Sequence, residues 1–466
     1  MRRLVEKRSM MATRDRKHPH AGRSSLVHWV VGAVLGLVLV GALPLDASAQ
    51  IAFLPDRQNL QGAGFRVRNL EIHPSFQGEL GWDSNVFLNK DNTTSSVISR
   101  LSARVAASSL TNQRLTQGDA PGNTPLNRKL SFRGTLGAEY YHYFSHAVSD
   151  NVAADANLDL HIRPDAPVSL RLYDRFLRQI RPFVDAPPTG PTPSFGMNQN
   201  AVGAMVQAQT RGGVLRGQLG YEFGFVFFDS SLFNANNYLA HRLSLGGQWQ
   251  FLPRTSLFQT TTVDLQRYTD PAASTSNTLS DNNRVVSTVG LNGVITQKIS
   301  LTVSGGYSAG FYKLMDSFSG VTARAELRYR PIQTIQTSIG YTRDFLPSWL
   351  GNYQRTDMLY LSSQLMIRGK ALLGARVGLS FNETGEALTP TGAPVGNSTR
   401  RNDTRVNGEI SAEYRATSWL GITATLGYVA SFTNYDYVVT MPGTIIPDPG
   451  SGYQRFDAWL GLRVFY

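Results

Sequence analysis

The chain has 466 residues, no cysteine and a net charge of +12, and its mean hydropathy is −0.20. The lack of cysteine excludes a disulfide scaffold and thiolate metal sites, and an aromatic content of 10% argues against a disordered chain. A helical membrane protein is excluded as well, because it needs several apolar stretches of about 20 residues and this sequence has one. The length permits two or three ordinary domains or one large all-β unit.

The single apolar stretch covers residues 26–43 and has the flanks of a secretory signal peptide. Eight basic residues precede it, and Pro44 and then Ala47-Ser48-Ala49 follow it. A basic segment, an apolar segment and a small-x-small site in that order predict a signal peptide over residues 1–49, cleaved before Gln50. The alternative is an uncleaved membrane anchor, which the stretch is barely long enough to form. The sequence therefore predicts an exported protein.

The signal peptide carries part of the positive charge. Its removal takes away eight basic and three acidic residues, so the net charge falls from +12 to +7. The remaining positive charge is almost all arginine, and the only lysines after residue 49 are Lys90, Lys129, Lys298, Lys313 and Lys370. An exported protein seldom meets nucleic acid, so we expect no nucleic-acid partner.

From Glu71 onward, apolar and polar residues alternate over segments of about 10 to 15 residues, twice the usual length of a strand in a soluble protein. In residues 130–140, Leu130 and Leu136 stand on one face, and Arg133 and Glu139 stand on the other. Segments 152–163, 321–330, 404–415 and 420–433 repeat the pattern. Since successive side chains of a strand point to opposite sides, each segment has one apolar wall and one polar wall.

Short and long connections alternate between these segments. The short turns lie near residues 164–165, 212–213, 253–254, 297–298, 331–332, 369–370 and 417–418. The longer polar loops lie around residues 84–94, 180–196, 229–236, 269–282, 345–355, 383–402 and 434–451. This asymmetry is typical of outer-membrane barrels, which have short periplasmic turns and longer external loops. The polar stretch 111–128 does not fit, because it is a long connection at the end where short turns are expected.

The segments predict an all-β fold, a transmembrane antiparallel up-and-down β-barrel of about eighteen strands over residues 71–466. An N-terminal periplasmic segment over residues 50–70 precedes it. Each strand has a share of about 22 residues, enough for a tilted membrane strand and its part of the connections. A propeller or a soluble sandwich is the structural alternative, but its strands would be about 5 to 6 residues long.

Aromatic residues cluster near the segment ends, as a membrane-interface girdle requires, whereas core aromatics of a soluble protein would lie in mid-strand. They are Trp82, Tyr140, Phe225, Phe227, Trp249, Phe251, Tyr307, Phe311, Tyr329, Tyr341, Tyr414, Trp419 and Tyr428. The chain also ends inside its last segment, at Tyr466. A terminal aromatic residue on an alternating strand is similar to the signal that the barrel-assembly machinery recognises, and it predicts that machinery as a partner.

The start of the barrel carries a resemblance to a known family. Gly64-Phe65-Arg66-Val67 and Pro74 lead to the run Gly-Glu-Leu-Gly-Trp-Asp-Ser-Asn-Val-Phe over residues 78–87. This opening is similar to that of the β-barrel porin type 2 family, which usually has Asp-Asp-Asn where this chain has Asp83-Ser84-Asn85. The resemblance implies a Gram-negative outer-membrane barrel, of a kind associated in some members with exopolysaccharide loci. It covers the first strand and loop only, and it implies location and architecture better than a substrate.

Catalytic and metal-binding patterns are scarce. The histidines after residue 49 show no HExxH or comparable spacing, and no G-x-S-x-G elbow or Walker loop is present. We therefore expect no metal, no cofactor and no enzymatic activity. One cluster has to be weighed as a barrel hydrolase, namely His142, Ser145, His146 and Asp150, although these residue types are also ordinary in polar external loops.

The polar wall is rich in arginine. Alternation places eleven of these residues on it: Arg100, Arg104, Arg133, Arg171, Arg216, Arg242, Arg324, Arg328, Arg376, Arg405 and Arg463. Since a charged side chain facing lipid at mid-membrane costs about 2 to 4 kcal/mol, we expect them to line the lumen. A guanidinium grips carboxylate or phosphate, so the wall suits an anionic permeant.

Fewer acidic residues are expected on that wall, chiefly Glu139, Asp155, Asp159, Glu222, Glu326, Glu409 and Glu413. The pairs Asp155 with Asp159 and Glu409 with Glu413 are expected to bind neighbouring arginines. A role as glycosidase acid and base is disfavoured, because a water-filled lumen would not shift their pKa values far.

The sequence thus predicts a passive outer-membrane channel for small or polymeric anionic or polyhydroxylated solutes. Its most specific form is an exit pore for an acidic exopolysaccharide. The predicted partners are outer-membrane lipid, lipopolysaccharide and polysaccharide-export components. Two alternatives stay open, a structural or adhesive barrel in which lumen arginines and acids pair to stiffen the wall, and a barrel hydrolase.

Overall fold

The computed structural model describes residues 64–67, 70–88, 90, 93–109, 129–145, 150–180, 196–229, 234, 236–269, 281–313, 315–348, 352–385, 400–433, 439–441, 444–446 and 452–466. The expected signal peptide, most of the segment 50–70 and the connection 111–128 lie outside these residues. Among the described residues, no helix is long and apolar enough to cross a membrane.

Eighteen long strands make up the main sheet. They are β2 Leu70–Asp83, β3 Ser96–Ser108, β4 Leu130–Tyr143, β5 Asn151–Ile162, β6 Val168–Ile180, β7 Gly196–Gln209, β8 Leu215–Phe228, β9 Tyr238–Leu252, β10 Thr255–Tyr268, β11 Asn282–Val294, β12 Ile299–Tyr312, β13 Phe318–Tyr329, β14 Ile335–Pro347, β15 Tyr353–Ile367, β16 Ala371–Thr384, β17 Arg401–Arg415, β18 Leu420–Thr433 and β21 Tyr453–Phe465. Three short strands accompany them, β1 Phe65–Val67, β19 Val439–Met441 and β20 Thr444–Ile446.

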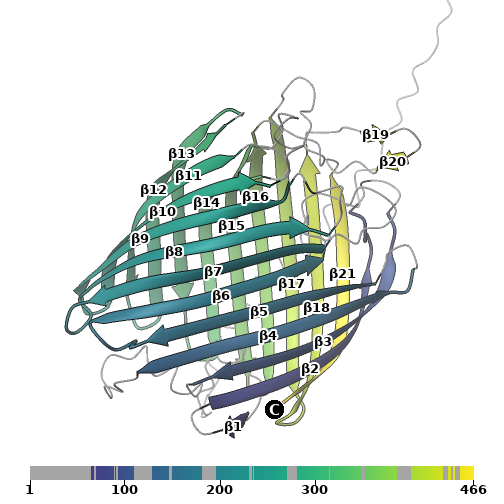
Figure 1. Ribbon diagram of the computed structural model, residues 1–466. Coiled ribbons are helices and arrows are strands. Elements are labelled where there is room, and N and C mark those ends of the chain that lie inside the picture. Colours follow the sequence, from purple (N-terminus) through teal and green to yellow (C-terminus); the bar gives the residue numbers. More distant parts are fainter. Residues whose placement is uncertain are drawn as a thin grey trace, which may run out of the picture.

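The sheet closes on itself. Each long strand pairs antiparallel with the next along the chain, and β2 pairs with the last strand, β21, from Ser75 opposite Phe465 to Asp83 opposite Asp457. Closure gives every long strand two neighbours, which satisfies the backbone groups that an open edge would leave unpaired. The eighteen-stranded antiparallel barrel predicted from the sequence is therefore confirmed (Figure 1).

Residues alternate between the two faces of the barrel wall. Large apolar side chains stand exposed on the outer face, where Leu136 and Val321 are 63% and 61% accessible. The inner face carries the polar residues of the same strands. A soluble sandwich would bury its large apolar side chains, so this pattern excludes it and shows that the outer surface suits an apolar surrounding.

The two ends of the barrel differ in their connections. Arg368 and Gly369 both have positive φ values, and Lys370 N–H donates to the Ile367 carbonyl over 3.0 Å, so β15 and β16 are joined by a tight turn of three residues. The C-terminus and β1 lie at this short-turn end, whereas the small β19–β20 hairpin lies at the opposite end (Figure 1). β1 falls within the segment 50–70 and pairs with β2 from Phe65 opposite Ile72.

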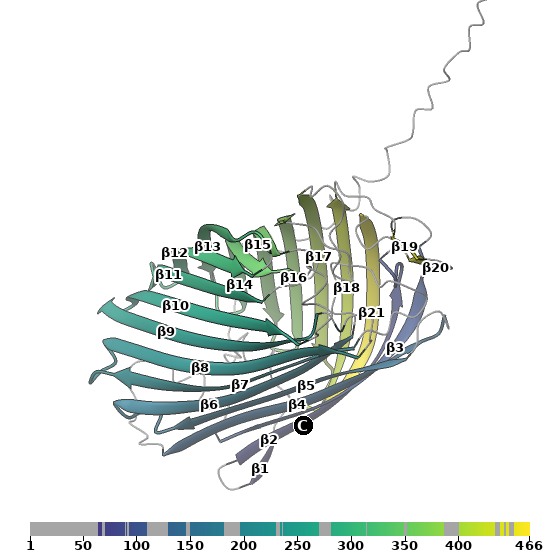
Figure 2. The same cartoon turned by 45° about the horizontal axis from the view of Figure 1, so that its top comes forward.

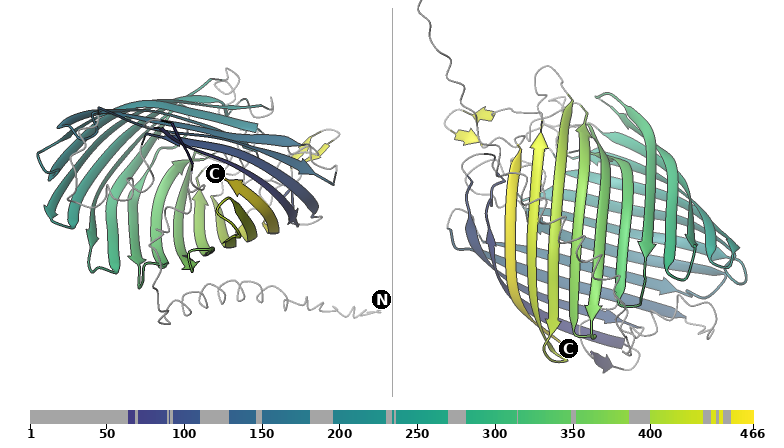
Figure 3. Two further views of the ribbon diagram at one scale, coloured as in Figure 1. Left: turned by 90° about the horizontal axis from the view of Figure 1, so that it is seen from below. Right: turned by 180° about the vertical axis from the view of Figure 1, so that it is seen from behind.

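The two walls of the barrel differ in tilt. Strands β2 to β9 run obliquely across the front of the view, and β14 to β21 stand more steeply behind them (Figures 1 and 2). Seen along its axis, the sheet has an oblong outline (Figure 3). The lumen is thus bounded by two long facing walls, and the polar side chains of both walls point toward it.

The first prediction concerns orientation. An epitope inserted near Pro394, in the connection between β16 and β17 and outside the described residues, should be labelled by antibody on intact cells. One inserted at Gly369, in the tight turn at the other end, should be labelled only after permeabilisation, because short turns face the periplasm. Labelling of intact cells at Gly369 alone would mean that the barrel is inserted the other way up.

Candidate functional site

The inner wall is the candidate functional surface. All eleven arginines expected on the polar wall lie on the inner face of the sheet, and the exposed apolar residues lie on its outer face. Arg324, for example, lies on β13 between two alanines of the outer face and directly across from Ser304. Strand alternation explains this common orientation, since each of the eleven stands an odd number of residues from the nearest exposed apolar side chain of its own strand.

Most of these arginines contact carboxylates. Seven of the eleven do so among the described residues: Arg100 with Glu79, Arg104 with Asp155, Arg171 with Asp159, Arg242 with Glu222 and Asp264, Arg324 and Arg328 with Glu326, and Arg463 with Glu413. Some of these pairs reach past an intervening strand. Arg104 on β3 contacts Asp155 on β5 across Gly137 of β4, where an added Cβ would lie 2.5 Å from the Asp155 carboxylate.

On the inner wall, Glu222, Glu326 and Glu413, like Asp264, are each contacted by two arginines. Glu222 is contacted by Arg175 and Arg242, both at 3.1 Å. Glu326 is contacted by Arg324 and Arg328 at 3.3 and 2.8 Å. Glu413 is contacted by Arg415 and Arg463 at 3.1 and 3.3 Å. Each group holds two positive charges and one negative charge, so the wall is locally positive even where its arginines are paired.

The Glu222 group belongs to a longer network. Arg175, Glu222, Arg242, Asp264 and Arg284 follow one another across the inner wall from β6 to β11, and we call this network the charged ladder. Arg284 and Asp264 are 3.1 Å apart, and both side chains are largely buried. Three arginines and two carboxylates alternate along the ladder, which again leaves one positive charge in excess.

The remaining four predicted arginines have other surroundings. Among the described residues, Arg133, Arg216 and Arg376 make no ion pair, and the Arg376 guanidinium lies 5.9 Å from the ring centre of Tyr360. Arg405 is on the inner face of β17, opposite Ser431. The guanidiniums of Arg133, Arg216 and Arg376 thus have no carboxylate partner among the described residues, in contrast to the seven paired arginines.

Sequence reasoning missed several charged residues of this wall. Arg175, Arg284, Arg401, Arg415 and Arg455 also lie on it, together with the acids Glu79, Asp83, Asp264, Asp403 and Asp457. The wall therefore carries more acids than the seven named from the sequence, although its arginines still outnumber them. Glu79 could have been found from the alternation, because it stands between the outer-face residues Gly78 and Leu80 in mid-strand. Others, such as Asp83 and Arg401, stand at strand ends, where the period stops.

The Asp83-Ser84-Asn85 motif turns the first loop into the lumen. Asp83 is fully buried, accepts a hydrogen bond from the Asn85 N–H over 2.9 Å, and lies 3.1 Å from Arg455. Asn85 donates to the Gln454 carbonyl over 3.0 Å. The motif thereby ties the start of the loop to β21.

The residues after the motif form an apolar plug on the inner wall. Val86 and Phe87 are buried against Ile98 and Tyr143, whose side chains point inward from β3 and β4. Burying four such residues stabilises the loop by several kcal/mol, since each buried apolar side chain contributes about 1.5 to 3 kcal/mol. The role supported for Asp83 and Asn85 is thus to hold an inward-folded loop, and neither contacts an open part of the lumen.

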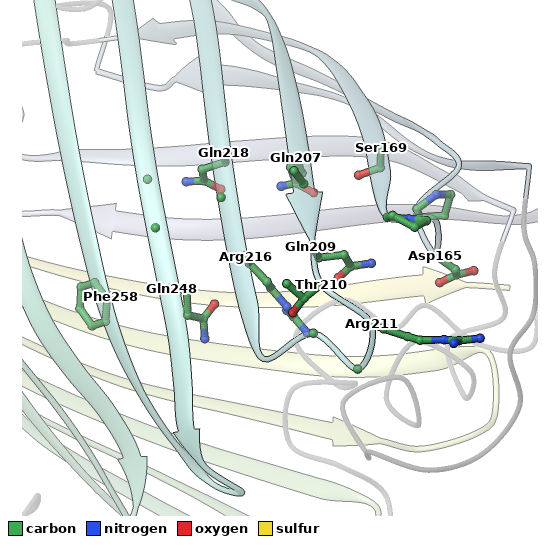
Figure 4. A pocket seen from close by; sticks show the side chains of 18 of the residues that line it. Asp165, Ser169, Gln207, Gln209, Thr210, Arg211, Arg216, Gln218, Gln248 and Phe258 are labelled. Carbon is green, nitrogen blue, oxygen red and sulfur yellow. The ribbon is translucent and has the colours of Figure 1, made fainter.

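A polar cavity of about 1000 Å³ lies on the inner wall at the short-turn end. It is lined by residues of β5 to β10 and of the short turns between them, and Figure 4 shows that Gln207, Gln218, Gln248 and Arg216 come from neighbouring strands around it. Phe258 is its one aromatic side chain. Neutral amides with both donors and acceptors predominate here, in contrast to the ion pairs of the charged ladder.

The hydrolase alternative gains no support from the geometry. His142 Nδ1 lies 2.9 Å from Asp150, and the hydrogen bond from Tyr140 holds the pKa of the Asp150 carboxyl below its usual range. Ser145 Oγ makes no hydrogen bond within the described part of the chain, and His146 lies outside it. No three His, Asp or Glu side chains of the described residues are placed to hold a metal ion.

No protein-family model matches the chain, and no curated protein does. Among solved structures, the chain is similar to the outer membrane protein OpdK of Pseudomonas aeruginosa, with a TM-score of 0.43, 9% identity and coverage of 85% of this chain and 99% of that one. It is also similar to the ferric enterobactin receptor PfeA of the same organism, with a TM-score of 0.40, 9% identity and coverage of 87% and 82%. The siderophore receptor PirA of Pseudomonas aeruginosa is similar as well, with a TM-score of 0.40, 11% identity and coverage of 85% of this chain and 80% of that one. The resemblance to the β-barrel porin type 2 family stays a prediction.

The second prediction tests the motif. Replacing Asp83 by Ala should lower the free energy of unfolding by about 3 kcal/mol, because it leaves the buried side of Arg455 without its nearest carboxylate and releases the loop. Urea unfolding followed by tryptophan fluorescence measures the change. The matched control is Asp159→Ala, since that carboxylate is 29% exposed and should cost clearly less. Equal losses would show that Asp83 is one lumen charge among many.

The third prediction concerns the hydrolase alternative. His142→Ala should leave phospholipid and peptide hydrolysis by purified protein at the background of an empty-vector preparation, because no nucleophile is positioned by this histidine. The wild-type protein should show the same background. Hydrolysis by wild type that disappears in the variant would establish an enzyme.

Proposed function

We propose that this protein is a porin-like channel of the outer membrane with a preference for anionic solutes. This proposal rests on the arrangement of charge on the inner wall, where Glu222, Glu326 and Glu413 are each contacted by two arginines. A wall with excess fixed positive charge attracts anions into a narrow aqueous path and repels cations.

The outer surface supports the membrane location. The outer surface of the closed barrel exposes large apolar side chains, including Leu136, Val321 and Leu460. Such a surface is unfavourable in water and matches the hydrocarbon layer of a membrane. Aromatic side chains are exposed near the strand ends, as at Trp249, Trp419 and Tyr414. Tyr466 is half exposed and stacks on Phe65 at 4.3 Å, which leaves it at the surface for recognition by the barrel-assembly machinery.

The finer version of the proposal concerns polyhydroxylated permeants, including an acidic exopolysaccharide on its way out of the cell. The cavity lined by Gln207, Gln218 and Gln248 supports it, because amide groups both donate to and accept from hydroxyl groups. An acidic polymer would meet these amides at the short-turn end and the charged ladder farther along the wall. Polysaccharide-export components and lipopolysaccharide are the partners that this version implies.

A second candidate function has a specific observation in its favour. The inward loop with Val86 and Phe87 and the many paired arginines would also suit a structural or adhesive barrel that conducts nothing. Conductance separates the two functions.

The fourth prediction is anion selectivity. In planar bilayers under a potassium chloride gradient, the reversal potential should show chloride preference. The double variant Arg324→Ala with Arg328→Ala should reduce the chloride-to-potassium permeability ratio by at least about twofold, because it leaves Glu326 without its two arginines. Oligogalacturonate, an acidic oligosaccharide, should block the wild-type current.

The matched control keeps the charge and changes the group. Arg324→Lys with Arg328→Lys should retain the wild-type reversal potential, since lysine carries the same charge. Potassium preference in the wild type would contradict the proposal. Absence of conductance in every protein would leave the structural barrel as the better account, and a chloride current that oligogalacturonate does not affect would remove the polysaccharide version alone.

A further inference from the structure

A second, smaller cavity lies on the inner wall of β4, β5 and β6. Its volume is about 190 Å³, below the range of about 300 to 1,000 Å³ for pockets that hold drug-sized ligands, so it suits one small molecule or one sugar unit. Arg133 of β4 and Arg171 and Arg175 of β6 line it, and we call it the arginine pocket. Asp159 of β5 is its one carboxylate, so the charged side chains of its lining carry three positive charges and one negative charge.

Strand register explains why the three arginines converge. Arg133 lies directly opposite Asp159, and Asp159 lies directly opposite Tyr173. Arg171 and Arg175 stand two residues before and after Tyr173 on β6. Because side chains two residues apart share one face of a strand, both guanidiniums point into the lumen beside Tyr173. The pocket therefore brings together arginines from two strands that are separated by β5.

The three guanidiniums differ in how far their N–H groups are used. Arg171 donates to Asp159 through Nη2 and through Nε, which lies 2.9 Å from the nearer carboxylate oxygen. Arg175 donates through Nη2 to Glu222 over 3.1 Å. Arg133 is exposed to the lumen and makes no hydrogen bond or ion pair among the described residues. Since a guanidinium has five N–H donors, all three retain donors for a ligand, and Arg133 retains the most.

Tyr173 holds the two guanidiniums of β6 in place. Its side chain is buried, and its ring centre lies 5.4 Å from the guanidinium carbon of Arg171 and 4.6 Å from that of Arg175. The Tyr173 hydroxyl donates to Glu222 over 2.9 Å, which fixes the ring. Guanidiniums held by ring contacts lose little freedom when a ligand binds, so the pocket is organised before the ligand arrives.

Two neutral side chains complete the polar lining. Asn157 Nδ2 donates to Thr135 Oγ1 over 3.2 Å. The hydroxyl proton of Thr135 and the amide oxygen of Asn157 remain available to a ligand. An inorganic anion needs donors only, whereas sugar hydroxyls need both donors and acceptors. The lining therefore matches a molecule that carries a carboxylate and hydroxyl groups together.

The arginine pocket adjoins the larger amide-lined cavity. His161 lines that cavity and lies 3.1 Å from Asp159 of the pocket. Gln207, Gln218 and Gln248 on the far side of His161 offer the donors and acceptors that neutral sugars need. Neighbouring units of one saccharide chain thus find an amide-lined surface next to a positively charged one.

We propose that the arginine pocket binds one sugar-acid unit, with its carboxylate between Arg133 and Arg171 and its hydroxyls at Thr135 and Asn157. This inference rests on the proposed channel function, because a ligand reaches the pocket through an aqueous lumen. It deepens that function by naming a site and a class of ligand, a monosaccharide carboxylate.

The fifth prediction concerns binding of this ligand. Purified full-length protein in detergent should bind D-galacturonate saturably in isothermal titration calorimetry. D-Galactose lacks the carboxylate and acetate lacks the hydroxyls, so each should bind at least about tenfold more weakly. Acetate or D-galactose that binds as tightly as D-galacturonate would overturn the assignment to a sugar acid.

A charge-removing variant tests the position of the site. Arg133→Gln should weaken D-galacturonate binding by about tenfold or more, because hydrogen bonds to charged groups are among the strong ones. Arg133 has no carboxylate partner among the described residues, so its loss leaves no acid unpaired there. The matched control is Arg254→Gln, which removes one positive charge from the exposed turn between β9 and β10. It should change binding less than twofold, and equal losses in the two variants would mean general attraction without a site.

Asn157→Asp is a second variant that keeps the shape of the side chain. It adds a negative charge beside the three arginines, so saturable D-galacturonate binding should be lost. Unchanged binding in this variant, or no saturable binding by the wild type, would overturn the pocket.

Reversal potentials of the same proteins in planar bilayers report separately on the channel. Chloride preference without D-galacturonate binding would remove the pocket and keep the proposed function. D-Galacturonate binding by a protein that conducts no ions would remove the channel and keep the binding site.

Discussion

Backbone hydrogen bonding in an apolar surrounding is the constraint on which the rest of this structure depends. Closure of the sheet between β2 and β21 gives each long strand two partners. Once the sheet is closed, the period of two assigns each strand residue to the outer or the inner face, and most charged residues of the strands face the lumen. A cluster of Arg355, Asp357 and Glu383 on the outer face of β15 and β16 is an exception. The pairing of charges in the lumen is then a consequence of confinement, since arginines and carboxylates from nearby strands share one narrow space.

Confinement also explains the character of the inner wall. Because arginines outnumber acids there, carboxylates such as Glu222 and Glu413 are shared, and positive charge is left over. Pairing of charges across strands stiffens the wall, and the excess of positive charge is the basis of the proposed preference for anions. The same arrangement of charges is thus compatible with a structural barrel and with a selective channel. The two functions differ in whether the apolar loop at Val86 and Phe87 leaves an aqueous path through the barrel.

The seam between β13 and β14 departs from the general rule, because its pairing stops at Ala323 opposite Arg343 and the upper ends of the two strands do not pair with each other. Arg284 satisfies the Phe345 carbonyl from across the wall, and the Phe345 ring covers Gly320 where backbone pairing stops. The same arginine is the end of the charged ladder. Arg284 therefore joins the electrostatic network to the interrupted seam.

The barrel and its eighteen strands could be predicted from the sequence, because they follow from a local period of two and from turn residues such as Gly369-Lys370. The same period predicts an inner-face position for the eleven arginines. The acids that those arginines meet could not be predicted, as with Arg104 and Asp155 across Gly137, since such pairs depend on the register of strands distant in the sequence. Only the tertiary structure decided that Asp83 and Asn85 hold an inward loop and that β13 and β14 part at Ala323. No periodic pattern encodes these features, because they arise where the alternation ends and side chains from several strands pack together.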